Sequence, residues 1–278
     1  MATYNLENYL ETASRTRPAK GDDAKAKIRE SIRAINPDVL ALQEIGGTNA
    51  LLELRDALQK EGNDFPHWEL VTGADTNINL AVLSRFPFSA RRPHTRESFL
   101  LNGRRFFVSR GFLEVDVQVN PNYSFTLIAA HLKSRRIVAP ADEAELRFQE
   151  AKLLREKIDA RLAAEPTANL LVLGDLNDTK DAASTKVVIG HGITKLVDTH
   201  PAERNGDTDS ELGNEARPIT WTHYYAKEDV YSRIDFILAS SGMAREWHWS
   251  QTYALRIPNW GLASDHRPIV ASFLAEDK

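Results

Sequence analysis

The chain has 278 residues, of which 42% are hydrophobic, and a formal net charge of -4 at pH 7. This length favours one large domain or two small ones, with enough apolar residues for a sizeable core. The absence of Cys excludes thiolate catalysis, Cys-based zinc sites and disulfide bonds, and the negative balance argues against strong nucleic-acid binding through overall charge alone.

The first third of the chain predicts helices over 22–35 and 48–60, and strands at the N-terminus, over 38–43 and over 78–84. Asp22 or Asp23 is expected to cap the first helix, and Asn36-Pro37 ends it. Thr48 is expected to cap the second helix. Both helices carry apolar residues at helical spacing on one face, so both are expected to cover a core.

The remaining chain predicts a helix over 142–163 and strands over 112–119, 124–130, 169–173, 233–239 and 268–274. The residues of 112–119 alternate between apolar and polar, which is typical of a half-exposed strand. Pro121-Asn122 turns the chain into the next strand, so the two form an antiparallel hairpin. Asp142 and Glu145 have capping-box spacing at the start of the long helix. Because hairpins occur among alternating helices and strands, the pattern alone leaves α/β and α+β open.

A short segment near the C-terminus, Ser264–Pro268 (SDHRP), places an Asp directly before a His. Asp265 offers a hard oxygen ligand, and His266 offers an imidazole that can move a proton. An apolar run follows, so the pair is expected where a loop enters a buried strand, a position at which a rigid sheet edge can hold catalytic groups. An Asp-His pair is common by itself, so its meaning depends on the rest of the chain.

The same arrangement recurs along the chain, with an apolar run beside a carboxylate, an amide or an imidazole. The segments are Thr3–Asn8, Ala41–Glu44, His131–Ser134, Leu173–Asn177 and Ser232–Leu238. These groups can meet only if the fold collects strand ends into one cleft. They span positions 5 to 266, so a division into two domains would split the site, and we expect a single domain over 1–278.

Together these motifs resemble those of the endonuclease/exonuclease/phosphatase superfamily, which has the DNase I-like fold. The most specific are TYNLEN at Thr3–Asn8, GDLN at Gly174–Asn177 and SDHRP at Ser264–Pro268. They cover nearly the whole chain in the family's order, and GDLNDT at Gly174–Thr179 looks like that of bacterial members. The resemblance implies an α+β fold arranged as a four-layer α/β/β/α sandwich, and a metal-dependent phosphoesterase.

Hydrolysis of a phosphate ester requires stabilisation of charge on an anion, a role suited to Mg²⁺ with oxygen ligands, with Mn²⁺ or Ca²⁺ as alternatives. The resemblance implies that Glu44 is the principal metal ligand and that Asp265 binds directly or through water. Asn5 and Glu7 lie two positions apart on the first strand, so alternation places both on one face, aimed at the same cation.

The resemblance also implies a catalytic set. Asp175 is expected to contact the attacking water, and Asn177 to orient that Asp or the phosphate. His266 is expected to act as general base or as a cationic clamp on the phosphate, according to its protonation. Asp235 would fix the tautomer of His266. His131 matches a second catalytic His of the DNase I-like and sphingomyelinase-like branches, which protonates the leaving oxygen or stabilises the phosphorane.

Substrate contacts are expected mainly from basic residues that follow the predicted strand ends. Asn79 is assigned as a support for His131. Arg110 is expected to contact phosphate, with an exposed strand position as the alternative. The aromatic run from Trp221 can stack a base or a sugar, with core or rim packing as the alternative. His94, His223 and His248 receive no role. The expected substrate-binding residues are Arg110, Lys133, Arg135, Arg136 and Trp221, with further basic pairs at Arg91-Arg92 and Arg104-Arg105.

The functional expectation is therefore a Mg²⁺-dependent phosphodiesterase, with nucleic acid as the expected substrate. Phosphomonoesterase and sphingomyelinase-like activities stay open, and a non-catalytic binding protein on the same fold is the alternative from another class. The inositol-phosphate 5-phosphatase branch is disfavoured, because its Cys is absent from Tyr231–Asp235.

No apolar run approaches the ~18 residues that a membrane span needs, and no signal peptide is visible. Met1 stands almost directly before the first predicted strand, which favours a leader that has been removed. The compartment, cytoplasmic or secreted, stays open, and a monomer is expected.

Overall fold

The computed structural model describes residues 1–14, 17–136, 141–204 and 218–277, and its main elements form two six-stranded sheets. The first sheet has the order β17 (Trp247–Ala254), β18 (Ile269–Phe273), β1 (Ala2–Tyr9), β2 (Val39–Ile45), β4 (Asn79–Ser84) and β3 (His67–Val71). The second has the order β11 (Val197–Asp198), β16 (Asp235–Ala239), β10 (Leu170–Asp175), β9 (Tyr123–His131), β8 (Phe112–Asn120) and β5 (Phe88–His94).

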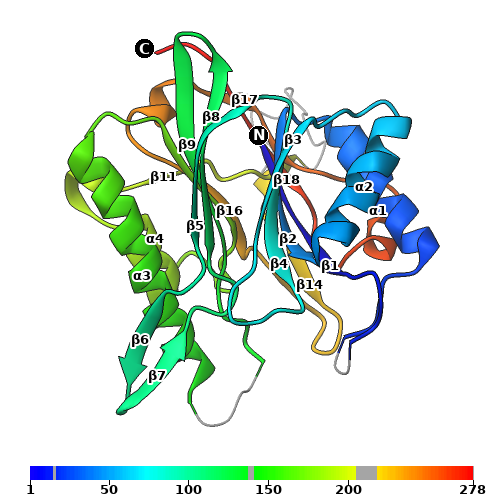
Figure 1. The fold of residues 1–278 in the computed structure, drawn as a ribbon, viewed down its shortest axis with the longest axis horizontal. Helices are drawn as coiled ribbons and strands as arrows, with labels where there is room; N and C mark the ends of the chain where they lie inside the picture. The colour runs from blue at the N-terminus through cyan, green and yellow to red at the C-terminus, as the bar shows by residue number, and fades with distance from the viewer. Residues whose placement is uncertain (15–16, 137–140, 205–217, 278) are drawn as a thin grey trace, which may run out of the picture.

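Helices cover the outer faces of both sheets (Figure 1). The pair α1 (Asp22–Ile35) and α2 (Thr48–Lys60) lies over the first sheet, and α3 (Glu143–Ala164) with α4 (Ala183–Ile189) lies over the second. Three short antiparallel strand pairs lie outside these sheets in the described residues, namely β6 (Ser98–Leu101) with β7 (Arg104–Phe107), β12 (Glu203–Arg204) with β13 (Pro218–Ile219), and β14 (His223–Tyr225) with β15 (Val230–Ser232). Short 3-10 helices are formed by η1 (Gly192–Thr194), η3 (Met243–Arg245) and η4 (Trp260–Leu262). No helix among the described residues is long and apolar enough to cross a membrane.

Three hydrophobic cores separate the four layers, because side chains alternate along each buried strand. In β2, Leu42 packs toward α1 and α2, whereas its neighbour Ala41 faces the second sheet. In β10, Leu173 faces the first sheet and Val172 packs under α3. The α+β fold and the α/β/β/α layers predicted from the motifs are therefore confirmed.

The predicted helices are present, but only one of the predicted caps is. The Asp142 side chain accepts a hydrogen bond from the Glu145 amide at 2.9 Å, as the capping-box spacing predicts. Asp22 and Thr48, in contrast, are the first residues of their helices, and glycines occupy the N-cap positions. A carboxylate distant in the chain caps α2 instead, because Glu11 accepts a bond from the Ala50 amide at 2.9 Å.

The sequence predicts that every second residue of β8 faces solvent, and Glu114 departs from that prediction because it is buried. Its side chain is 3% exposed and lies 2.6 Å from Arg92 Nε, 2.7 Å from His94 Nε2 and 2.6 Å from Arg161 Nε. Burial by itself raises the pKa of Glu114, but hydrogen bonds from His94 and Arg92 outweigh it and lower the pKa to about 2. The neighbouring strand β5 and helix α3 thus supply cations that the alternation of a single strand does not reveal.

Gly174 provides a test of how tightly β10 is fitted beside β9. Its φ is 129°, and a Cβ at this position would lie 2.0 Å from the Ala130 carbonyl oxygen. We expect Gly174→Ala to destabilise the protein by about 3 kcal/mol or more, through backbone strain and this clash. Urea unfolding measures the effect, with Gly21→Ala as control because nothing lies within 4 Å of its Cβ position. Equal stability of the two variants would refute this account.

Candidate active site

The candidate site lies where strand ends of the two sheets meet. In the second sheet, Asp175 at the end of β10 is paired in register with His131 of β9 on one side and with Asp235 of β16 on the other. Three functional groups are therefore neighbours through backbone pairing alone. All three residues are buried, so their polar atoms must be satisfied by one another or by a ligand.

The first sheet contributes through Asn5 of β1. The Asn5 Nδ2 donates a hydrogen bond of 2.9 Å to Asp175 Oδ2, across the two sheets. The Asn5 carbonyl accepts a bond of 2.8 Å from the Ser264 hydroxyl, which in turn accepts one of 3.0 Å from the His266 amide. These contacts hold the segment before β18 against the ends of both sheets, so residues of distant sequence position share one rigid frame.

His266 is oriented by Asp235, as the resemblance implied. The ring atom His266 Nδ1 lies 2.8 Å from Asp235 Oδ2, and Nε2 lies 3.7 Å from Asp175 Oδ2. Burial by itself lowers the pKa of His266, but the charges of Asp235 and Asp175 outweigh it and raise the pKa well above its ordinary value. In the metal-free site the imidazole is therefore a cation that presents Nε2 to Asp175.

Both carboxylate oxygens of Asp175 lie close to nitrogen atoms that can donate hydrogen bonds. Its Oδ1 accepts a bond of 2.8 Å from the Asn177 amide, and its Oδ2 lies 3.5 Å from His131 Nε2. Burial raises the pKa of Asp175 to about 7, with the nearby charge of Asp235 in the same direction and that of His266 in the opposite one. A carboxyl group with this pKa can hold or release a proton near neutral pH.

His131 has the opposite electrostatics to His266. Burial lowers the pKa of His131 well below its ordinary value, and the positive charge of Arg110 lowers it further. Its Nε2 faces Asp175 and lies 3.9 Å from Glu44 Oε1. The described residues provide no hydrogen-bond partner for His131 Nδ1. The support predicted from Asn79 is not formed there, because Asn79 Nδ2 donates to the Gly46 carbonyl at 2.7 Å.

Strained backbone surrounds the carboxylate of Glu44. Glu7, Asn8 and Glu44 have φ values of 46°, 60° and 59°, a left-handed conformation that is uncommon for residues other than glycine. The register between β1 and β2 shifts there, so both strands bulge at the site. Glu44 Oε2 accepts a bond of 3.1 Å from the Asn8 amide, and Arg17 Nη1 lies 3.5 Å from the same oxygen.

The bulge also corrects the predicted shared face of Asn5 and Glu7. Simple alternation stops at Glu7, because its backbone turns left-handed. Asn5 points to Asp175, whereas Glu7 is 42% exposed and lies 3.3 Å from Lys20 Nζ. Burial and the charge of Asp265 raise the pKa of Glu7.

The five predicted substrate-binding residues differ in burial, since two are buried, two are exposed and one is partly buried. Arg110 is buried and donates to the Leu132 carbonyl at 3.2 Å, so the exposed alternative for it is wrong. Lys133 is also buried, and its Nζ donates to the carbonyls of Ser134 and Arg136. The other residues lie nearer the surface: Arg135 and Arg136 are exposed, with Arg135 at 3.0 Å from Asp178, and Trp221 packs against Trp260 and Arg267.

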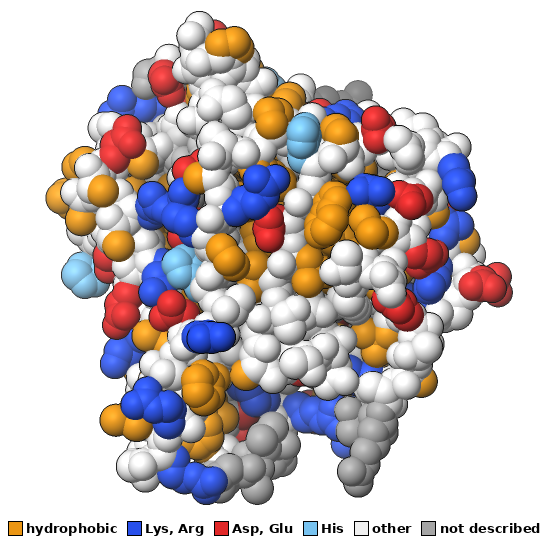
Figure 2. All heavy atoms as spheres, viewed as in Figure 1, with side chains coloured by type: hydrophobic (Ala, Val, Ile, Leu, Met, Phe, Trp, Pro, Cys, Tyr) orange, Lys and Arg blue, Asp and Glu red, His pale blue; other side chains and the backbone are white. Residues whose placement is uncertain are grey.

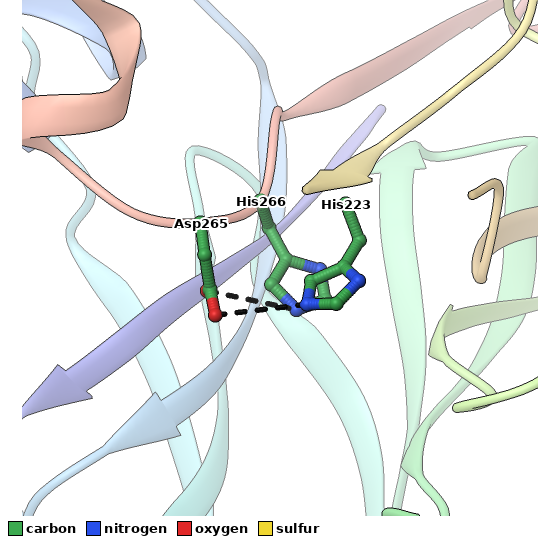
Figure 3. Close-up of side chains that lie close together, drawn as sticks. All are labelled: His223, Asp265 and His266. Carbon is green, nitrogen blue, oxygen red and sulfur yellow. Dashed lines mark ion pairs between the residues drawn. The ribbon is translucent and has the colours of Figure 1, made fainter. Parts of the chain in front are cut away.

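His223 is a member of the cluster to which the sequence assigned no role. Its Nε2 lies 3.6 Å from Asp265 Oδ2, and its ring centroid lies 4.6 Å from that of His266 (Figure 3). Its place in the aromatic run before Asp235 was the one available indication in the sequence. Arg17 beside Glu44 was missed for a different reason, because no strand or motif marks its position.

Comparisons with known proteins identify a family and a fold. The family model described as Endonuclease/Exonuclease/phosphatase family matches residues 2–266. Among solved structures, the human Nocturnin catalytic domain with bound sulfate is 16% identical, with a TM-score of 0.64 over 99% of this chain and 94% of that one. No curated protein sequence matches the chain.

Two bacterial structures are similar to the same degree. The Neisseria 3′ phosphatase NExo, bound to product DNA hairpin, is 16% identical, with a TM-score of 0.63 over 98% of both chains. Sphingomyelinase C from Streptomyces griseocarneus is 19% identical, with a TM-score of 0.62 over 97% of both chains. At these identities the solved structures establish the fold, and the activities belong to those proteins.

Because the charged form of Asp175 is buried, we expect it to lower the free energy of unfolding when no metal is bound. The pKa of Asp175 is about 7 in the folded state and 3.8 ordinarily, so folding takes up protons and stability falls as pH rises between these values. We expect Asp175→Asn to be more stable in EDTA at pH 8, by about 1–3 kcal/mol, since an amide keeps the shape without the charge. Urea unfolding from pH 5 to 9 measures both proteins.

The pH dependence separates this effect from general repacking. The advantage of the Asn variant should grow between pH 5 and about 7, where the folded Asp175 loses its proton, and stay constant above. Asp178→Asn is the control, because hydrogen bonds and charge from Arg147 outweigh burial and hold the pKa of Asp178 low. A variant that is less stable than the native protein at pH 8 would contradict the account.

Proposed function

The chain belongs to the Endonuclease/Exonuclease/phosphatase family, and from this premise we propose that it is a Mg²⁺-dependent phosphodiesterase acting on nucleic acid. Family membership makes the protein a metal-dependent hydrolytic phosphoesterase. The observation that carries the finer proposal is the position of Asp175 Oδ2, within 3.7 Å of the facing nitrogens of both His131 and His266. We further propose that residues 1–278 form one catalytic domain, since both sheets contribute to this cluster.

The donor set at the site fits a hard divalent cation. Asp175 and Asp235 are paired neighbours, and His131 Nε2 lies 3.5 Å from Asp175 and 3.9 Å from Glu44, so carboxylate oxygens of the kind that Mg²⁺ prefers gather around one ring. We assign Glu44 as the principal Mg²⁺ ligand, with Asn5, Glu7 and Asp265 as further oxygen donors. When bound, the ion would supply positive charge against the anionic ester.

The protonation of each protein group determines the role that we assign to it in the reaction. Asp175, poised near neutral pH, accepts the proton of the attacking water, and the Asn177 amide at 2.8 Å holds it in place. His266, charged and fixed by Asp235, donates from Nε2 to a phosphoryl oxygen, where negative charge increases in the transition state. The cationic role is thereby favoured over the general-base role for this residue.

His131 is assigned to the leaving group. As a buried neutral imidazole beside Asp175 and Glu44, it can donate a hydrogen bond to the departing oxygen. The alkoxide that leaves a phosphate ester benefits from such a donor. Two imidazoles on either side of one carboxylate therefore support hydrolysis of a phosphate ester, and the choice of a diester rests on the surface cations.

Nucleic acid is favoured among diesters by cations on the surface. Arg135 and Arg136 are exposed directly after the buried Lys133, and Arg104 with Arg105 is exposed on the projecting hairpin β6–β7 (Figure 1). The view in Figure 2 shows Lys and Arg side chains mixed with Asp and Glu, without one continuous basic face. Binding to phosphates would therefore depend on a few local arginines.

The metal assignment predicts a specific loss of binding. Calorimetry with Mg²⁺ or Mn²⁺ should show at least about tenfold weaker binding for Glu44→Gln, because a charged oxygen donor is lost from a site with few protein ligands. Glu30→Gln is the matched control, because it makes the same substitution on α1, away from the site. The side chain of Glu30 is 50% exposed and pairs with Lys27. Equal affinity of native protein and Glu44→Gln would remove Glu44 from the ligand set.

The nucleic-acid assignment predicts a steep salt dependence of KM for a DNA or RNA substrate, since bound counterions are released from the phosphates. Arg135→Ala with Arg136→Ala should reduce the slope of log KM against log salt concentration by about two, and leave turnover of a small diester unchanged. Arg33→Ala with Arg55→Ala on the opposite helical layer is the control, with no expected change. A flat salt profile in the native protein would favour a small or lipid diester instead.

A further inference from the structure

Three potential ligand atoms converge beside the proposed reaction centre, and two of them are nitrogens. His223 Nε2 lies 3.6 Å from Asp265 Oδ2, and His266 Nε2 lies 3.8 Å from Asp265 Oδ1. One ligand atom from each of the three residues lies within 4.8 Å of those of the other two. Figure 3 shows both imidazoles and the carboxylate pointing toward the same space.

The backbone fixes this arrangement before any ligand arrives. The Tyr224 amide donates to the Asp265 carbonyl at 2.9 Å, and the Arg267 amide donates to the Thr222 carbonyl at 2.7 Å. These two bonds form an antiparallel bridge between His223 and His266, so the hairpin strand β14 and the segment before β18 are locked in register. The separation of the two rings therefore does not depend on flexible side chains alone.

The orientation, exposure and spacing of these side chains also favour the binding of a cation. Because His266 Nδ1 lies 2.8 Å from Asp235, Nε2 is the nitrogen left for a cation, in the carboxylate–histidine–metal arrangement common in metal sites. The side chain of His223 is 17% exposed and that of Asp265 is 40% exposed, so an ion can reach them from solvent. At metal–ligand distances of about 2.1 Å, tetrahedral ligand atoms lie about 3.4 Å apart. The two nitrogen–oxygen separations, 3.6 Å for His223 and 3.8 Å for His266, exceed this value by a few tenths of an ångström.

We propose that His223, Asp265 and His266 form a second cation site that selects nitrogen-preferring transition metals such as Zn²⁺. Imidazole nitrogens suit Zn²⁺ and Co²⁺, whereas Mg²⁺ prefers oxygen ligands and gives up its water reluctantly. Asp265 is common to both proposed sites, and this site differs from the one assigned to Glu44 by its two nitrogens. A transition metal should therefore bind here while Mg²⁺ is present in excess.

Occupation of this site inhibits the reaction. This consequence rests on the proposed function, in which His266 donates from Nε2 to the phosphate. Binding of a metal ion to Nε2 requires that His266 release the Nε2 proton to solvent, and the metal then occupies the electron pair that held it. His266 can therefore no longer act as a hydrogen-bond donor there. Zn²⁺ is then an inhibitor of Mg²⁺-supported hydrolysis, and His223 sets how strongly it acts.

The direct test is metal binding without turnover. Titration of the native protein with Co²⁺ in excess Mg²⁺, followed by its visible absorption, should show one site, and calorimetry should give the affinity for Zn²⁺ under the same conditions. His223→Gln should weaken Zn²⁺ binding at least about tenfold. His191→Gln, an exposed histidine after α4, and Glu44→Gln should both retain native Zn²⁺ affinity.

Each outcome has a defined meaning. Equal Zn²⁺ affinity of native protein and His223→Gln overturns the site, and so does an equal loss in Glu44→Gln, which would indicate one shared metal centre. Circular dichroism of the variants establishes that they fold. Inhibition by Zn²⁺, measured relative to the Mg²⁺ activity of each variant, should require about tenfold more Zn²⁺ in His223→Gln. Zn²⁺ binding without inhibition would leave the site in place and refute the donor role proposed for His266.

Discussion

The burial of several carboxylates at the junction of two sheets is the constraint on which this structure depends. Asp175 and Asp235 are paired across adjacent strands and are almost fully buried, an arrangement that is costly unless positive charge or hydrogen bonds offset it. The structure offsets it with the Asn5 amide, with the Asn177 backbone and with the charged ring of His266. These partners hold the carboxylates in place where the two sheets meet.

Backbone strain accompanies this charge. Glu7, Asn8, Glu44 and Asn177 all have left-handed backbones, and three of them lie where β1 and β2 lose register. Such conformations cost on the order of 1–3 kcal/mol each and persist only when the surrounding structure determines them. Here the cores on both sides of the first sheet provide that support, so stability in the layers offsets strain at the ends of the strands.

Most of the inward-facing cations serve the interior of the protein. Arg147 lies 3.0 Å from Asp178, Arg155 donates to the carbonyls of Val188 and Ile189, and Arg267 lies over the ring of Trp221. A count of basic residues therefore overestimates the charge available to a substrate. Recognition of an anion has to rely on the site itself and on exposed arginines at its rim.

The elements and many residues of the candidate site could be predicted from the sequence, because their determinants are local. Apolar periodicity placed α1, α2 and α3 within a residue of their bounds. Polar residues beside apolar runs, together with the resemblance to the family, identified His131, Asp175 and Asp235. Contacts between distant segments were beyond that reasoning. The burial of Glu114, the capping of α2 by Glu11, and the approach of His223 to Asp265 arise when separate strands are packed together. Local pattern determines which residues can act, whereas packing decides their partners and hence their protonation, since burial and neighbouring charge exist only in the folded chain.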